Sequence, residues 1–215
     1  MVHAFGIRDF LRLLEGAEWT VLLSLIAFAG GGLAGLAVAL ARLSRHVWLR
    51  GPALVFVRVN QGTPVLIQLF VVFFGAAFLG IEINPLLAAS ACLIVNTGAL
   101  LGETWAGCIQ AIPRGQWQAA AALGVRWRPT FVRVILPQAA RIAVAPTVGF
   151  LVHIVKATSL AALIGFVELS RAGQITNNST FQPMLVFGLI GAGYFALCWP
   201  LSLAASHLER RMRRP

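Results

Sequence analysis

Charged residues are scarce in this chain of 215 residues, where Asp, Glu, Lys and Arg together make up 11%. Soluble proteins carry about a quarter. Hydrophobic residues account for 59%, so the composition excludes an ordinary soluble domain and favours a membrane protein. The net charge of +10 does not indicate a nucleic-acid-binding domain, because the basic residues lie between apolar runs instead of forming one stripe.

Cysteine pairs, histidine clusters and nucleotide-binding loops are also missing. The three cysteines lie singly in apolar sequence, which excludes a disulfide framework. The four histidines fall in different segments, so no metal site is predicted. No Gly-x-x-x-x-Gly-Lys-Ser/Thr segment is present, and the single lysine, Lys156, follows His153-Ile154-Val155. We therefore expect no catalytic residues and no cofactor in this chain.

Five apolar runs are long enough to cross a bilayer, for which a helix needs about 20 residues. These runs are 19–41, about 53–81, about 86–109, about 142–167 and 183–205. The first is too long for a signal peptide, so we expect it to remain as a membrane anchor. The sequence predicts an all-α membrane protein of five transmembrane helices. Its expected parts are an N-terminal segment 1–18, a transmembrane domain 19–205 and a basic tail 206–215.

Arginine is distributed unevenly between the segments that flank these runs. Segments 42–58, 113–141 and 207–215 hold thirteen arginines and a single acid, Glu209. The N-terminus and the other two connections hold four basic residues and five acids. Because positively charged loops stay in the cytoplasm, the N-terminus is predicted outside and the C-terminus in the cytoplasm.

A basic loop of about residues 113–137 connects the third and fourth predicted helices. Pro113 suits the first turn of a helix, the alanines at 119–122 favour its continuation, and Gly124 suits a left-handed cap. We expect a short helix, a turn, and a second short helix stopped by Pro137. Two interpretations stay open: an amphipathic hairpin on an anionic lipid surface, or a docking element whose small side chains admit a cytoplasmic partner.

Seven residues of this loop have a defined spacing: Gln118, Ala119, Ala120, Gly124, Val134, Leu136 and Pro137. The spacing resembles the Glu-Ala-Ala, Gly, Ile-x-Leu-Pro loop of ATP-binding-cassette importer permeases. Gln118 replaces the usual Glu, and Val134 the usual Ile. Gln118 can still hydrogen-bond but brings no charge to the helix N-terminus, so we expect coupling to be weakened at most.

Other stretches follow in a fixed order: Gln61-Gly62-Thr63-Pro64-Val65-Leu66-Ile67-Gln68, Asn96-Thr97-Gly98-Ala99 with Glu103, Ile112-Pro113-Arg114-Gly115-Gln116-Trp117, Lys156-Ala157-Thr158-Ser159-Leu160, Glu168-Leu169, Arg171-Ala172-Gly173-Gln174 and Leu208-Glu209-Arg210-Arg211. They resemble the polar amino-acid uptake subfamily of these permeases, with Gln61 where Arg is common. The likeness covers the chain from about residue 15.

The resemblance implies a permease subunit of a bacterial inner-membrane importer that moves a polar amino acid by alternating access. Its expected partners are a cytoplasmic ATPase dimer that binds ATP and Mg²⁺, an extracytoplasmic substrate-binding protein, a second permease subunit, and membrane lipid, but no nucleic acid. In the family's mechanism, the loop helix sits in a groove of the ATPase dimer. The residues implied for coupling are Gln118, Ala119, Ala120, Gly124, Leu136 and Pro137, and Gly124 would set the bend of the lever.

Polar side chains inside apolar runs are costly in a bilayer and therefore indicate function. The candidate substrate path consists of Gln68, Asn96, Glu103, Thr158 and Ser159. Asn96 and Glu103 share one helical face because they lie seven residues apart. Thr158 and Ser159 interrupt the fourth run, where non-helical backbone is tolerated only if it is buried or lines a cavity.

Alternative roles stay open for two path residues. Glu103 can instead pair with an arginine at the cytoplasmic interface, such as Arg114 or Arg141. Gln68 can instead hydrogen-bond a neighbouring helix.

Four further positions bear on cargo and partners. Lys156 either recognises a carboxylate or extends to the interface. Ala157 stands where the family often has Asp, which mildly disfavours lysine-like or arginine-like cargo. Glu168 and Arg171 flank an outer loop that either meets the binding protein or is a solvated turn.

A secondary transporter or channel subunit with an interfacial loop is the alternative function. The odd number of spans and the lack of a visible internal repeat disfavour it. A membrane-embedded enzyme is disfavoured as well, because no nucleophile with a base and no cluster of histidine and acid falls at membrane depth.

Overall fold

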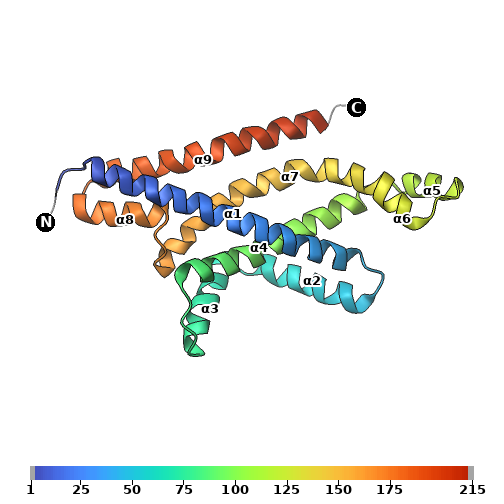
Figure 1. Ribbon diagram of the computed structural model, residues 1–215, viewed down its shortest axis with the longest axis horizontal. Coiled ribbons are helices and arrows are strands. Elements are labelled where there is room, and N and C mark those ends of the chain that lie inside the picture. The colour runs from blue at the N-terminus through green and yellow to red at the C-terminus, as the bar shows by residue number, and fades with distance from the viewer. Residues whose placement is uncertain (1–2, 213–215) are drawn as a thin grey trace.

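The computed structural model describes residues 3–212, and over that range the chain is helical with no strand (Figure 1). The elements in chain order are α1 (Ile7–Leu43), α2 (Val47–Gly62), α3 (Val65–Phe78), α4 (Pro85–Gln110), α5 (Arg114–Ala122), α6 (Trp127–Thr130), the π-helical η1 (Phe131–Ile135), α7 (Leu136–Ala157), the 3₁₀ helix η2 (Thr158–Ile164), α8 (Leu169–Thr180) and α9 (Pro183–Met212). In Figure 1 the four long helices α1, α4, α7 and α9 run along the long axis, and α3 projects from the body.

Within the described residues, four helical stretches are long and apolar enough to cross a membrane: Ile7–Leu43, Pro85–Gln110, Trp127–Ile164 and Pro183–Arg211. The chain has five spans only if α2 and α3 count as one, and these two helices are bent by 103°. A single helix over the predicted run 53–81 is therefore not formed. The cause is Pro64, which has no N–H and disfavours helical backbone at Thr63 before it; Thr63 is extended, with φ −114° and ψ 127°.

The ends of the chain are more helical than the predicted segments suggest. Most of the predicted N-terminal segment 1–18 belongs to α1, which begins at Ile7. The carboxylate of Asp9 accepts the backbone N–H of Gly6 at 3.0 Å and so caps the first turn. The predicted tail 206–215 continues α9 as far as Met212, and its last residues, 213–215, lie outside the described range.

Glycines bring α1 and α4 into close contact along their length. On α1 these are Gly31 and Gly35, and on α4 they are Gly98 and Gly102. A Cβ added at Gly31 would lie only 2.5 Å from the Cβ of Thr97. Lipid tails supply no hydrophobic force between helices, so small residues spaced by four let the backbones approach and gain dispersion contacts. This pair of helices forms the frame of the subunit.

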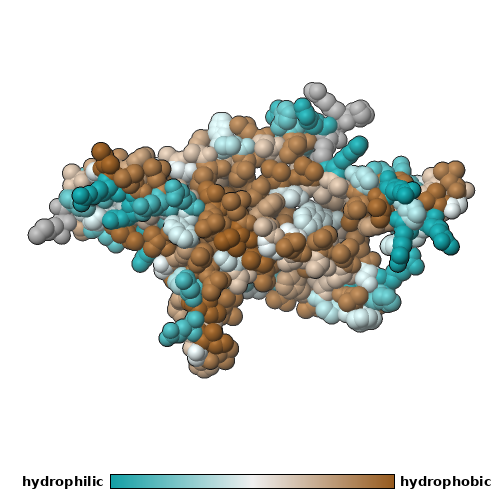
Figure 2. Space-filling view, in the orientation of Figure 1, coloured by the Kyte–Doolittle hydropathy of each residue, from teal (hydrophilic) through white to brown (hydrophobic). Residues whose placement is uncertain are grey.

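Buried apolar side chains form three clusters. The first lies between α1, α3, α4 and the end of α7 and contains Leu23, Ala27, Leu69, Ala88, Ala89, Cys92, Leu93, Ile154, Ala161 and Ile164. The second joins α1, α8 and α9 through Leu13, Leu169, Ala172, Val186 and Ile190. The third lies beneath the α5–α6 loop and contains Ile112, Ile135 and Ala139. Figure 2 shows a broad hydrophobic middle with hydrophilic residues gathered towards the two ends, as a lipid-facing surface requires.

The fourth predicted run begins earlier than expected, because the helix is continuous over Trp127–Ile164. The expectation that Pro137 stops the second short helix of the loop is wrong. Pro137 lies in the first turn of α7, directly after the π-helical turn, so its missing N–H breaks no regular hydrogen bond there. The expected interruption at Thr158 is observed as the start of the 3₁₀ segment η2, which ends at Gly165 with φ +89°.

Candidate coupling site and substrate path

The candidate coupling loop lies at one end of the molecule as α5, a tight turn and α6 (Figure 1). Gly124 has φ +70°, in the left-handed region that glycine adopts without strain. The N–H groups of Gly124 and Val125 donate to the carbonyls of Ala121 and Ala120, each at 3.0 Å. Because this pair of bonds closes the last helical turn, the prediction that Gly124 ends the helix with a left-handed cap is confirmed.

Most of the residues predicted for coupling face outwards. Five of them are exposed: Gln118, Ala119, Gly124, Leu136 and Pro137. The sixth, Ala120, is 7% exposed and turns towards the protein. Since alanine and glycine carry little side chain, a partner can approach the backbone of α5 closely.

Three aromatic rings connect this loop to the membrane helices. The ring centroid of Trp117 on α5 lies 6.4 Å from that of Phe131, and Trp127 stacks on Phe131 at 5.5 Å with an interplanar angle of 7°. Such pairs contribute roughly 0.5–1.5 kcal/mol beyond their buried area. Phe131 opens the π-helical turn that leads into α7, so α5 is packed directly against the start of a membrane-spanning helix.

Glu103 pairs with an arginine, although not with either of the two expected. Its Oε1 accepts a hydrogen bond from Nη2 of Arg42 at 2.8 Å, and the second oxygen, Oε2, is buried with no partner among the described residues. The prediction of Arg114 or Arg141 as the partner is wrong. Arg42 comes from the end of α1, and only the close packing of α1 on α4 brings it to Glu103.

Gln68 stabilises the bend between α2 and α3. Its Nε2 donates to the carbonyls of Asn60 at 3.0 Å and of Thr63 at 2.9 Å. These carbonyls lose their intrahelical partners where α2 ends. Gln68 therefore makes the kind of interhelical hydrogen bond that its alternative role requires, while it also lines a cavity of about 310 Å³ between α2, α3 and α4.

The remaining path candidates differ in accessibility. Asn96 is 6% exposed and Thr158 is fully buried, with the Thr158 hydroxyl donating to the carbonyl of Val155 at 2.7 Å. Ser159 is partly exposed and donates to the carbonyl of Lys156 at 2.7 Å. Lys156 lines a cavity of about 520 Å³ on the α9 side of the molecule. Within one subunit, Ser159 and Lys156 are thus open to a solute whereas Thr158 is enclosed.

Sequence reasoning missed a buried polar network around Glu168. Its carboxylate accepts hydrogen bonds from Tyr194 Oη at 2.6 Å and from the backbone N–H groups of Ser170 and Arg171, both at 3.0 Å. The hydroxyl of Thr20 lies 3.4 Å away. Glu168 is completely buried, so its side chain does not belong to a solvated turn, whereas a contact of the outer loop with the binding protein stays a prediction.

Two signals in the sequence could have pointed to this network. Tyr194 is the only tyrosine of the chain and lies inside an otherwise clean apolar run. Glu168 directly precedes a helix, where a carboxylate can cap the first N–H groups. A buried Tyr hydroxyl needs a partner, and the N-cap carboxylate supplies it.

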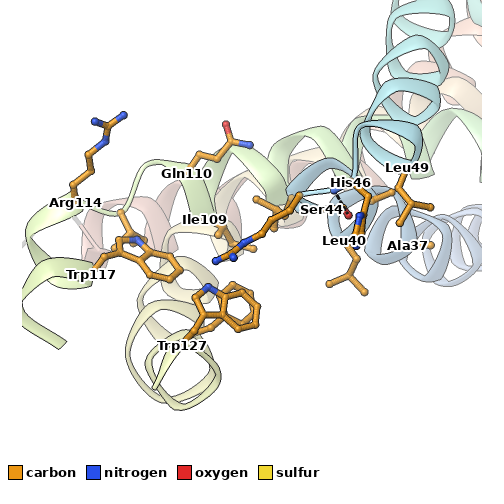
Figure 3. Close-up of a pocket in the computed structure, with 15 residues that line it drawn as sticks. Ala37, Leu40, Ser44, His46, Leu49, Ile109, Gln110, Arg114, Trp117 and Trp127 are labelled. Atoms are coloured by element: carbon orange, nitrogen blue, oxygen red, sulfur yellow. Dashed lines mark hydrogen bonds between the residues drawn. The ribbon is translucent and has the colours of Figure 1, made fainter. Parts of the chain in front are cut away.

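A cavity of about 1210 Å³ opens beside the coupling loop. It lies between the α1–α2 turn, the end of α4, and α5 and α6 (Figure 3). Figure 3 shows the indoles of Trp117 and Trp127 close together on one side, with Ser44 and His46 on the other. The cavity combines aromatic and basic side chains at the end of the membrane-spanning helices.

Comparison with known proteins agrees with these features. Residues 31–214 match the family described as binding-protein-dependent transport system inner membrane component. The chain is 33% identical to the probable amino-acid ABC transporter permease protein YckA of Bacillus subtilis, over 96% of this chain and 91% of the relative. It is 34% identical to the glutamine transport system permease protein GlnP of Escherichia coli, over 94% and 93% of the two chains.

A solved structure shows the same arrangement of helices. It is described as the crystal structure of an amino acid ABC transporter with histidines, and one of its chains superimposes with a TM-score of 0.91 at 28% sequence identity. The match covers 95% of this chain and 96% of the other. The likeness thus includes both ends of the molecule as well as the spans.

Proposed function

The chain belongs to the family of inner-membrane components of binding-protein-dependent transport systems, and on that premise we propose that it carries a polar amino acid into the cell. As a member of this family it is a multi-pass inner-membrane permease subunit, a transport component and not an enzyme. The proposed cargo class rests on two relatives that are about one-third identical and are matched over nearly their full length. They are an amino-acid permease and a glutamine permease.

The proposed topology has the N-terminus outside and the C-terminus in the cytoplasm. Five crossings, with α2 and α3 counted as one, leave the two termini on opposite sides. In Figure 1 the N-terminal end of α1 and α8 lie at one end of the molecule, and α5, α6 and the last turns of α9 lie towards the other. The arginine-rich segments belong to that second end, which the positive-inside rule assigns to the cytoplasm.

The proposed role of α5 is to couple this subunit to a cytoplasmic ATPase dimer. Its exposed alanines admit close approach, and the packed rings of Trp117, Phe131 and Trp127 carry a displacement of α5 into α7. ATP and Mg²⁺ bind to the ATPase subunits and not to this chain. An extracytoplasmic binding protein delivers the amino acid, and a second permease subunit, the same or homologous, completes the pathway.

For the substrate path, the accessible residues are the stronger candidates for direct contact. Ser159 offers a hydroxyl, and Lys156 beside it offers an ammonium group suited to the carboxylate of an amino acid. Asn96, Glu103 and Gln68 remain proposed path residues; Asn96 is buried, and the side chains of Glu103 and Gln68 hydrogen-bond neighbouring segments. Thr158 contributes by fixing the backbone where the α-helix tightens into η2.

The coupling proposal is tested by Gly124→Asp in the chain purified with its partners from its native membrane. Asp tolerates left-handed backbone better than most residues, so the fold is retained while a carboxylate is placed on the exposed turn. We expect co-purification of the ATPase to be lost and amino-acid uptake into proteoliposomes to fall more than ten-fold.

The matched control is Gly115→Asp, which adds the same side chain to an exposed glycine in open space at the start of α5. It should keep ATPase binding. If Gly124→Asp retains both the ATPase and uptake, the docking role of α5 is wrong. If the wild-type chain is purified from its native membrane under gentle conditions without any ATPase, the secondary transporter or channel alternative replaces the importer.

A further inference from the structure

Two cavities beside the coupling loop adjoin each other. The first, of about 1210 Å³, is bordered by Ser44, Arg45, His46, Arg114, Trp117 and Trp127 among its lining residues (Figure 3). The second, of about 440 Å³, runs between α1, α4 and α7. Leu40, Leu43, Ile109 and Phe131 line both, so the second cavity lies directly beside the first.

The second cavity is an apolar groove. Of its lining residues only Trp105 and Thr147 carry polar atoms that hydrogen-bond, and they bond each other at 2.9 Å between Nε1 and Oγ1. No polar side-chain atom on the walls of the groove is therefore left without a hydrogen-bond partner. Because the groove lies between helices that are long and apolar enough to cross a membrane, we expect hydrocarbon chains to surround it.

The first cavity is basic, and no acid lines it. The guanidinium carbon of Arg45 lies 5.9 Å from the ring centroid of Trp127. Among residues 3–212 neither Arg45 nor Arg114 forms an ion pair, whereas Arg42 is paired with Glu103. Figure 3 shows the guanidinium of Arg114 at the outer side, directed away from the two indoles. Two guanidinium groups without an ion pair therefore border the first cavity, Arg45 against Trp127 and Arg114 on the outer side.

We propose that one anionic phospholipid occupies these cavities, with its phosphate in the basic cavity that Arg45 and Arg114 border and an acyl chain in the groove between α1, α4 and α7. Guanidinium groups bind phosphate oxygens in bidentate fashion, and tryptophans prefer the headgroup level. A free anion would leave the apolar groove unfilled. The site goes beyond the proposed function, since it needs only the membrane and not a particular cargo.

A lipid in this position would contact both the α1–α2 turn and the coupling loop. Trp117 of α5 and Trp127 of α6 line the headgroup cavity, and Phe131, on which both rings pack, lines the groove as well. The bound lipid therefore supports the same aromatic contacts that connect α5 to α7. Coupling is expected to depend on anionic lipid for this structural reason.

The test measures lipid retained by the purified full-length chain in native mass spectrometry, with phosphatidylglycerol and phosphatidylcholine of identical acyl chains as probes. We expect phosphatidylglycerol to bind at least ten-fold more tightly. The double variant Arg45→Gln/Arg114→Gln should weaken it about thirty-fold, since each basic residue near an anionic surface contributes roughly a five-fold factor. The control Arg50→Gln/Arg128→Gln removes the same charge from exposed arginines outside the cavity and should change binding less than about three-fold.

The groove is tested separately. Ala140→Phe fills it from the exposed face of α7 and should displace phosphatidylglycerol, while Ile142→Phe on the same helix, outside the groove, should not. If the two double arginine variants lose phosphatidylglycerol binding equally, the effect is one of surface charge and the proposed site is wrong. If inorganic phosphate binds as tightly as phosphatidylglycerol in the same measurement, the assignment of an acyl chain to the groove is overturned. Release of the ATPase by Arg45→Gln/Arg114→Gln with lipid binding unchanged would assign the cavity to the ATPase interface instead.

Discussion

The two ends of the molecule treat their charged groups in opposite ways. At the end where α8 meets α1 and α9, the carboxylate of Glu168 is fully buried and accepts hydrogen bonds from Tyr194 and two backbone N–H groups. At the α5–α6 end, Arg126 and Arg128 are exposed, and Arg45 and Arg114 border an open cavity. A satisfied buried network rigidifies a region, whereas exposed charge is available to partners and lipid. The Glu168 network therefore stabilises the first end, whereas the arginines of the second end are available for contact.

The middle of the molecule belongs with the first end. Thr20 on α1 links the Glu168 network to the helix that packs on α4 through glycines. The α5–α6 loop has no comparable polar support and depends on stacked aromatic rings. Substitutions should therefore cost stability at the α8 end and the α1–α4 contact, and should change transport at the loop with little loss of stability.

The largest expected effect is that of Glu168→Ala. It leaves the hydroxyl of Tyr194 and two backbone N–H groups without their acceptor, and charged hydrogen bonds contribute about 1.5–3 kcal/mol each. Because the Tyr194 hydroxyl keeps Ser170 as a partner at 2.9 Å, we expect the loss to be that of the two backbone bonds, about 3–6 kcal/mol of unfolding free energy in detergent. The matched control is Glu18→Ala, which removes an exposed acid of α1 at the same end of the molecule. This variant should leave the unfolding free energy unchanged. Equal stability of the two variants would show that the buried network is not a stabilising element.

A smaller effect is expected for Gly31→Val in the α1–α4 contact. Its Cβ would approach the Cβ of Thr97 to 2.5 Å, so the helices must separate, at a cost of about 1–3 kcal/mol for overpacking. Thermal unfolding in detergent measures the loss. Gly32→Val is the control, because a Cβ there meets only the ring of Trp105 at 3.9 Å. If both variants are equally stable, close packing at Gly31 is not what holds the two helices.

The smallest effect is expected for Gln118→Glu in the loop. Gln118 is the fifth residue of α5, beyond the first turn in which a carboxylate gains from the helix dipole. Restoring the family's Glu should change binding-protein-stimulated ATP hydrolysis of the assembled complex by less than about two-fold. Gln116→Glu lies within the first turn and serves as the control for added charge alone. A much larger change at Gln118 would mean that residue 118 meets a cation of the ATPase.

Local rules were sufficient where a residue acts on its own neighbours. The left-handed cap at Gly124 follows from glycine's freedom at positive φ. The change of helix type at Thr158 was likewise anticipated from a polar pair inside an apolar run. Pro137 shows the limit of such rules, because the π-helical turn before it accommodates the proline and lets the helix continue.

Pairs that are distant in sequence could not be predicted. Arg42 and Glu103 are separated by 61 residues, and Thr20 and Glu168 by 148. Each side chain alone was visible as a polar residue near or inside an apolar run. Its partner depends on which helix packs against which face, and a single sequence without relatives contains no record of that choice.

The sequence by itself determined the membrane class, the positions of the apolar runs, and the loop spacing that resembles importer permeases, because hydropathy and turn chemistry act within about 20 residues. Only the tertiary structure decided that Glu168 is sealed from solvent and that Arg42 holds Glu103. These outcomes depend on how closely α1 approaches α4 and α8. That approach is fixed by the packing of whole helix faces, which no short stretch of the chain specifies.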